Sequence, residues 1–115
     1  MTDRKTTGIK GEEMSVLFLR KLGYEIIILN WRHKKLEVDI IAKDGETLVF
    51  VEVKVRRSSA FAEISDLINT KKQENMFEAA EAYLELYPGY EQIRFDVIVY
   101  INNKLTYIKD AFWNY

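Results

Sequence analysis

The stretch LVFVEVKVRR, from Leu48 to Arg57, decides the fold because it combines a strand pattern with charges placed inside it. Valine recurs at every second position, and this alternation predicts a β-strand with one apolar face. Glu52 and Lys54 lie two residues apart in the same run, so a strand carries both side chains on the face opposite the valines. A charged pair inside an otherwise apolar strand needs a partner or a ligand on that face.

The composition is that of one globular domain. The chain has 115 residues, of which 48% are hydrophobic and 30% charged, so we expect a single domain over residues 1–115 with one core. The absence of cysteine excludes disulfides and cysteine-rich zinc sites and favours a reducing, cytoplasmic setting. No apolar run reaches the roughly 18 residues of a membrane span or forms a signal peptide, so we expect no membrane association.

The net charge is small, but the charged residues are unevenly distributed along the chain. A formal net charge of −1 argues against binding nucleic acid through bulk charge alone. Basic residues gather between positions 32 and 72, whereas residues 74–91 contain glutamates and no Lys or Arg. A local basic surface is therefore compatible with the acidic total, and the alternative is that these runs are simply solvated faces.

Periodicity and turn signals predict a helix, three strands, a second helix and two more strands. Apolar spacing predicts the helices at Ile9–Leu22 and Lys71–Leu86, the second one opening with the capping-box sequence TKKQ. The predicted strands are, in order, YEIIILNW (24–31), LEVDIIA (36–42), TLVFVEVKV (47–55), IRFDVIVYI (93–101) and KLTYIK (104–109). The predicted fold class is therefore α/β, with a mixed sheet of about five strands flanked by the two helices.

A hairpin joins the second and third strands and sets which residues face each other. Asp44-Gly45 is a strong two-residue turn signal, and pairing the residues on either side of it places Asp39 opposite Phe50. Asp39 is then diagonal to Glu52, with the α-carbons about 7–8 Å apart, and Glu37 lies opposite Glu52. The other face of the hairpin is expected to be core, and it carries Val38, Ile40, Val49, Val51, Val53 and Val55.

The acidic face of this hairpin suggests a metal. Carboxylates that face each other on a sheet repel, and partial burial raises their pKa unless a cation intervenes. Lys54 alone cannot offset three acids. A hard divalent ion, Mg²⁺ or Mn²⁺, is the simplest compensation because it prefers carboxylate, carbonyl and water ligands. The alternative is an ordinary solvated strand face, for which Val-Glu-Val-Lys is a common sequence.

An acid, a spacer and then Glu-x-Lys on adjacent strands, on this order of elements, resembles the restriction-endonuclease-like, or PD-(D/E)XK, nucleases. Short motifs are also similar to those of the YraN family, and in chain order they are GEE (11–13), LGY (22–24), NWR (30–32), EVDIIA (37–42), LVFVEVKVR (48–56), RFDV (94–97) and AF (111–112). That family consists of small bacterial proteins of this superfamily, and the match covers nearly the whole chain. The resemblance implies a restriction-endonuclease-like fold and a metal-dependent nuclease that hydrolyses phosphodiester bonds of DNA, including structured or branched DNA.

The sequence departs from the family pattern at two positions. Leu36 stands where a Gly often precedes the Glu of the motif GEIDLI, and Ala62 stands where a Gly follows the aromatic residue after the third strand. Both changes would reshape the rim of the site, and neither removes a candidate ligand.

The resemblance also implies roles for individual residues. Asp39 and Glu52 would be the direct ligands of Mg²⁺ or Mn²⁺, with the backbone carbonyl of Val53 as a third. Lys54 would orient or activate the attacking water and stabilise charge developing on the phosphate. Glu12 matches a further acid that related nucleases bring toward the metal, and the alternative is an ordinary Glu favoured by the helix dipole.

Basic and polar residues around the site are expected to contact nucleic acid, with DNA favoured over RNA, and they are Arg32, Lys34, Arg56, Arg57, Lys72 and Gln73. Helix capping is the alternative role for Gln73. Glu37 is expected to act through Arg32 or a water rather than as a ligand. His33, the single histidine, is expected to be a surface residue or phosphate contact rather than a general base. Aromatic residues at strand ends and near the chain end are expected to complete a core or a dimer contact, with core favoured, and the alternative is stacking on nucleic-acid bases; they are Trp31, Phe112, Trp113 and Tyr115.

Two other functions are compatible with the same fold. The first is a nucleic-acid-binding module without catalysis, and the second is an interaction protein whose acids form a solvated face. The intact set of Asp39, Glu52 and Lys54 favours the nuclease, whereas the acidic total charge slightly favours the interaction protein. A homodimer is left open.

Overall fold

The structure, a computed structural model, describes residues 4–56 and 68–113, without the side chains of residues 4–9. Its elements are α1 (Arg4–Lys21), β1 (Glu25–His33), β2 (Leu36–Asp44), β3 (Thr47–Arg56), α3 (Thr70–Leu86), β4 (Gln92–Ile101) and β5 (Lys104–Ile108). The predicted order of helix, three strands, helix and two strands is confirmed. No helix within these residues is both long and apolar enough to cross a membrane.

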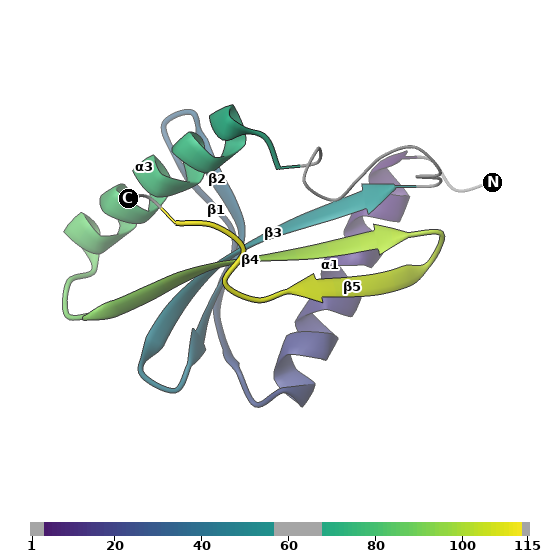
Figure 1. Ribbon diagram of the computed structural model, residues 1–115, viewed down its shortest axis with the longest axis horizontal. Helices are drawn as coiled ribbons and strands as arrows, with labels where there is room; N and C mark the ends of the chain where they lie inside the picture. The colour runs from purple at the N-terminus through teal and green to yellow at the C-terminus, as the bar shows by residue number, and fades with distance from the viewer. Residues whose placement is uncertain (1–3, 57–67, 114–115) are drawn as a thin grey trace.

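The strands form one mixed sheet in the order β1-β2-β3-β4-β5. Neighbouring strands are antiparallel except β3 and β4, which run parallel. Two parallel neighbours need a crossover, and α3 provides it. The helices α1 and α3 lie on opposite faces of the sheet, as Figure 1 shows. The predicted α/β class with a five-stranded mixed sheet is therefore confirmed.

Each helix covers its own apolar cluster. On the α3 side, Met76 and Tyr83 pack with Phe50 and Phe95, and Trp31 is buried among them. The predicted core role of Trp31 is thereby confirmed. Phe112 packs against the same cluster, as predicted, whereas Trp113 is 42% exposed and Tyr115 lies outside the described residues.

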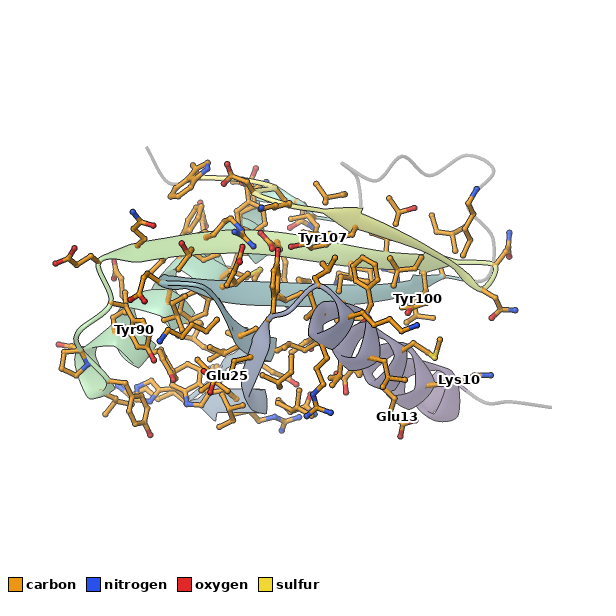
Figure 2. The ribbon with its side chains drawn as sticks, turned by 90° about the horizontal axis from the view of Figure 1, so that it is seen from below. Lys10, Glu13, Glu25, Tyr90, Tyr100 and Tyr107 are labelled. Carbon is orange, nitrogen blue, oxygen red and sulfur yellow. The ribbon has the colours of Figure 1, made fainter. Side chains whose placement is uncertain are left out.

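On the α1 side, Val16 and Leu19 pack with Ile40, Val49 and Val51, which are fully buried. Figure 2 shows α1 against this face, with Tyr100 of β4 and Tyr107 of β5 in the sheet that it covers and Glu13 on the outer surface of the helix. The valine face of the third predicted strand is therefore core at these positions, as its alternation predicts.

The predicted register of the hairpin was wrong by two residues. Asp44 pairs with Thr47, and Ile40 pairs with Val51, so the turn is Gly45-Glu46 rather than Asp44-Gly45. Gly45 has a φ of +61°, a left-handed conformation that glycine adopts without steric penalty, and this requirement places glycine inside the loop. Because side chains alternate with a period of two, this shift leaves the faces unchanged.

The start of α3 also differs from the prediction. Asn69, and not Thr70, is the N-cap, because its Oδ1 accepts a hydrogen bond of 2.9 Å from the Lys72 backbone N–H. Asn is among the best N-cap residues. The Gln73 side-chain amide donates to the Ile68 carbonyl at 3.3 Å, which supports the alternative that Gln73 closes the start of the helix.

Gly11 lies where α1 approaches β3 closely, and this contact generates the first prediction. A Cβ at this position would lie 2.5 Å from Val55 Cγ2. Alanine is normally better than glycine in a helix by about 1 kcal/mol, but overpacking of this kind costs about 1–3 kcal/mol. We therefore expect Gly11→Ala to lower the free energy of unfolding, measured by urea denaturation.

A second substitution at the contact separates overpacking from helix propensity. Val55→Ala removes the Cγ2 that the new methyl group would meet, so the double variant Gly11→Ala/Val55→Ala should be more stable than the sum of the single effects predicts. Additive effects of the two substitutions would contradict the close approach.

Candidate active site

The candidate site lies where β2 and β3 separate. Their ladder ends with the pair Ile40 and Val51. Beyond it, the Val53 backbone N–H donates a 2.8 Å hydrogen bond to Oδ2 of Asp39. A carboxylate therefore satisfies a backbone group that would otherwise seek a strand carbonyl. This bond fixes Asp39 beside the segment of β3 that carries Glu52.

The alternation of β2 is interrupted at the same point. Val38 packs in the α3-side cluster, whereas Ile40 packs in the α1-side cluster. The prediction that these two residues share one face was wrong. The ladder of β2 with β3 ends at Ile40, and Val38 lies beyond it, where β2 is paired only with β1. Asp39 and Glu52 are therefore the first residues beyond the last observed pair of the ladder, and they are not related by the predicted diagonal.

Glu52 is a buried carboxylate with one occupied and one free oxygen. The residue is 3% exposed, and its Oε1 lies 3.3 Å from Lys54 Nζ and 3.1 Å from Lys72 Nζ. Its Oε2 is buried without a hydrogen-bond partner, and no other buried side-chain N or O atom in the described part of the chain is in this state. Because buried polar atoms are almost always partnered, this oxygen is a candidate ligand atom.

The electrostatics of Asp39 reflect the same crowding of acids. Burial, and next the nearby Glu52 carboxylate, raise the pKa of Asp39 from 3.8 to about 7, while the hydrogen bond from Val53 acts in the opposite direction. The Glu12 charge also raises this pKa, and the Lys72 charge lowers it. Acids from β2, β3 and α1 therefore act on one another, and a bound cation would stabilise all of them in the charged form.

Glu12 is the acid that α1 contributes. Its Oε2 accepts a long hydrogen bond of 3.4 Å from Asn30 Nδ2. Asn30 has a φ of +51°, a left-handed conformation that Asn tolerates better than most residues. The motifs GEE and NWR, far apart in the sequence, thus meet through these two side chains.

The predicted nucleic-acid contacts are spread over several elements. Lys72 reaches the site itself, through Glu52. Lys34 is exposed in the turn between β1 and β2, and Arg56 is exposed at the end of β3. Gln73 lies at the start of α3, and Arg57 falls outside the described residues.

Glu37 is not part of the acidic group. It is exposed and forms an ion pair of 3.6 Å with Arg32, itself a predicted nucleic-acid contact. The predicted position of Glu37 opposite Glu52 was wrong because of the two-residue shift in the hairpin. His33 stacks on Trp31 with ring centroids 5.8 Å apart.

A second charged cluster, on β4, escaped the sequence analysis. Arg94 donates to both oxygens of Asp96 at 2.9 Å, and Asp96 also accepts bonds from the Tyr107 hydroxyl and the Asp110 N–H. The Arg94 guanidinium bonds Asp44 at 2.8 Å and lowers the pKa of that carboxyl. The available signal was RFDV, in which two opposite charges lie two apart in a buried strand, as in VEVK of β3.

The two clusters differ in whether their hydrogen bonds are satisfied. Both oxygens of Asp96 have partners within the chain, which is what a structural ion pair requires. Glu52 keeps one oxygen free. A shallow pocket near Arg94 and Trp113, at the start of β3 and β4, does not include Asp39 or Glu52. The chemistry therefore points to β3 rather than to this pocket or to the β4 cluster.

The donor set at Glu52 fits a hard divalent cation. No group of three or more His, Cys, Asp or Glu side chains close enough to hold a metal occurs among residues 4–56 and 68–113. Mg²⁺ typically takes only one or two carboxylates and keeps water or substrate phosphate as its other ligands. Asp39 and Glu52, the second of which has a buried oxygen without a hydrogen-bond partner, meet that smaller requirement.

The chain has the restriction-endonuclease-like type of α/β fold. The Holliday junction resolvase Hjc of Archaeoglobus fulgidus has a similar structure, with a TM-score of 0.59 and 16% sequence identity, over 88% of this chain and 75% of that chain. The likeness shows the fold alone. It agrees with the fold class that the sequence resemblance implies.

The chain belongs to the uncharacterised protein family UPF0102, whose family model matches residues 11–100. The UPF0102 protein of Christiangramia forsetii is 40% identical over 117 aligned residues and covers 98% of each chain. That of Caldicellulosiruptor saccharolyticus is 44% identical, over 96% of this chain and 99% of its own. The resemblance to a family of small proteins that the short sequence motifs carry is therefore confirmed by the family model and by both relatives.

Asp39 should make the stability of the fold depend on pH. A carboxyl with a folded-state pKa of about 7, raised from 3.8, binds its proton more tightly in the folded than in the unfolded chain. Its contribution to stability is therefore fully present below about pH 4 and is lost as the pH rises through about 7. Asp39→Asn, which can still accept from Val53, should become more stable relative to wild type over this range.

Urea denaturation with chelator, from about pH 4 to about pH 8, measures this difference. Glu85→Gln is the matched control because Glu85 is exposed. A constant difference in free energy of unfolding between Asp39→Asn and wild type across the series would contradict the raised pKa.

Proposed function

We propose that this chain is a metal-dependent nuclease that hydrolyses phosphodiester bonds of DNA. The observation that carries the proposal is the buried Glu52 carboxylate, which has two lysines on one oxygen and no partner on the other. A carboxylate of this kind, beside a second acid of raised pKa, is unfavourable unless it serves a ligand. The restriction-endonuclease-like fold supports the same reaction class by analogy.

Asp39 and Glu52 are proposed to hold Mg²⁺ or Mn²⁺, with the Val53 carbonyl as a further ligand and Glu12 as the acid that α1 contributes. When bound, such an ion neutralises charge on the phosphate and lowers the pKa of a coordinated water. The chain itself fixes the geometry, because Asp39 is oriented by the Val53 N–H and Glu52 by two ammonium groups.

Lys54 is proposed to act on the reacting groups. Its side chain is 22% exposed, and its Nζ lies 3.3 Å from Glu52, so the ammonium group is held at the site but still reachable from solvent. A fixed positive charge at this position would orient the attacking water and stabilise the charge that develops on the phosphate.

The DNA backbone is proposed to contact the basic and polar residues that the sequence predicts for this role, which are Arg32, Lys34, Arg56, Arg57, Lys72 and Gln73. With a net charge of −1, binding would depend on this local set rather than on the whole surface. The protein of similar fold is a Holliday junction resolvase, which makes branched DNA the first substrate to test. A cytoplasmic location, a single domain over residues 1–115 and a homodimer remain predictions.

A nucleic-acid-binding module without catalysis is the second candidate. The observation that favours it is the small acidic set, because the described residues contain no group of three metal-binding side chains. Cleavage assays separate the two candidates, since both predict binding to DNA and only the first predicts hydrolysis.

Glu52→Gln should abolish cleavage. We expect wild type to cleave branched, nicked, linear or single-stranded DNA with Mg²⁺ or Mn²⁺, and the variant to lose at least about a hundredfold in rate, because the substitution removes a ligand charge. Glu46→Gln, in the exposed turn of the same hairpin, is the matched control and should cleave normally. Wild-type cleavage that survives a chelator would exclude the metal, and no cleavage of any substrate would favour the binding module.

Lys54 and Arg56 should separate catalysis from binding. Lys54→Met should lower the single-turnover rate at saturating DNA much more than it lowers affinity, because its interaction strengthens mainly in the transition state. Arg56→Ala should weaken DNA binding and flatten its salt dependence while leaving that rate nearly unchanged. Equal losses of rate and affinity in Lys54→Met would contradict the assignment.

A further inference from the structure

Lys72 occupies a position that the helix itself disfavours. It is the residue whose N–H bonds the N-cap Asn69, in the first turn of α3, which contains Lys71 and Lys72 and no acid. A positive charge near a helix N-terminus is disfavoured by the helix dipole, and Glu or Gln is preferred at this position. The charge therefore needs a compensating partner, and that partner is Glu52.

Two ammonium groups share one oxygen of Glu52 while the other oxygen has no hydrogen-bond partner. Lys54 Nζ and Lys72 Nζ lie 3.3 Å and 3.1 Å from the same Oε1, and Oε2 is free. Two like charges this close to one atom repel each other. Two positive charges therefore contact an oxygen that one would suffice to neutralise. If one lysine leaves, the other still forms an ion pair with Glu52.

Lys72 is the one that can leave. Lys54 lies on β3, two residues from Glu52, so the sheet fixes both ends of that contact. Lys72 reaches Glu52 from a different element, and its side chain is more exposed, at 29% against 22% for Lys54. An ammonium group released at the start of α3 lies where a phosphate is favoured by the helix dipole.

We propose that Lys72 is a displaceable counter-cation: it neutralises Glu52 in the metal-free protein, gives way when a divalent cation binds Asp39 and Glu52, and then contacts a DNA phosphate. The inference rests on the proposed function, whose site it shares. Cation binding and DNA binding are then coupled through one side chain. By linkage, each ligand strengthens the other by the same factor.

The first experiment measures Mn²⁺ binding by calorimetry without nucleic acid. Lys72→Met removes the competing charge and leaves Lys54 on Glu52, so it should bind Mn²⁺ more tightly, by about fivefold or more. Lys71→Met removes an exposed charge from the same turn and is the matched control, expected to bind like wild type. Lys72→Arg keeps the charge and should restore the wild-type affinity.

The second experiment measures the coupling itself. Fluorescence anisotropy gives the affinity for a branched DNA with and without Ca²⁺, which takes the same oxygen ligands. The ratio of the two affinities should be large in wild type and in Lys71→Met and clearly smaller in Lys72→Met. Thermal unfolding of each variant confirms that all of them are folded under these conditions.

Several outcomes would overturn the inference. An unchanged or weaker Mn²⁺ affinity in Lys72→Met, equal tightening in Lys71→Met, an unchanged coupling ratio, or no Mn²⁺ binding by any variant would each do so. Failure of the proposed nuclease looks different, because tighter Mn²⁺ binding by Lys72→Met together with no DNA cleavage would leave the counter-cation role intact. Cleavage by wild type with no effect of Lys72→Met on Mn²⁺ would remove the counter-cation role alone.

Discussion

The arrangement of the site depends on a carboxylate buried inside the sheet. Glu52 is 3% exposed, and an ionised carboxylate at such a position is tolerated only when opposite charge surrounds it. The separation of β2 from β3 after Ile40 and Val51 leaves room for that charge, and Lys54 and Lys72 supply it from two different elements. The same separation leaves the Val53 backbone N–H free to donate a hydrogen bond to Asp39. The end of the β2–β3 ladder therefore positions Asp39 as well as making room around Glu52.

A comparison within the molecule shows why this cluster, and not its counterpart on β4, is the candidate site. Glu52 and Lys54 on β3 have the same spacing as Arg94 and Asp96 on β4, and both pairs lie in buried strands. Arg94 binds Asp96 through both oxygens, and the Tyr107 hydroxyl completes the set, so that pair needs nothing further from solvent. The β3 pair leaves Glu52 Oε2 without a partner. Spacing alone cannot separate the two cases, because the difference lies in partners that come from distant parts of the chain.

The sequence predicted those features that follow from local periodicity. The order of elements, the α/β class and the burial of Val49 and Val51 all rest on alternation within one segment, which survives even a register error of two residues. The register itself depended on which loop position needs a left-handed backbone, and Gly45 decided it. From the sequence, Lys72 could be predicted only to lie near the same site as Glu52. The distance between Lys72 Nζ and Glu52, and the carboxylate oxygen that Lys72 contacts, depend on how α3 crosses the sheet.

The crossover helix links the fold to the chemistry. The helix α3 connects the parallel strands β3 and β4. Its first turn lies beside the part of β3 that contains Glu52, as the contact between Lys72 and Glu52 shows. The start of the helix is then held by two kinds of contact, the local cap of Asn69 with the bond from Gln73 to Ile68, and the long-range ion pair of Lys72. The local contacts involve neither Asp39 nor Glu52. In the proposed role of Lys72, only this ion pair responds to a cation at Glu52, so the change repositions one side chain and leaves the core that α3 covers in place.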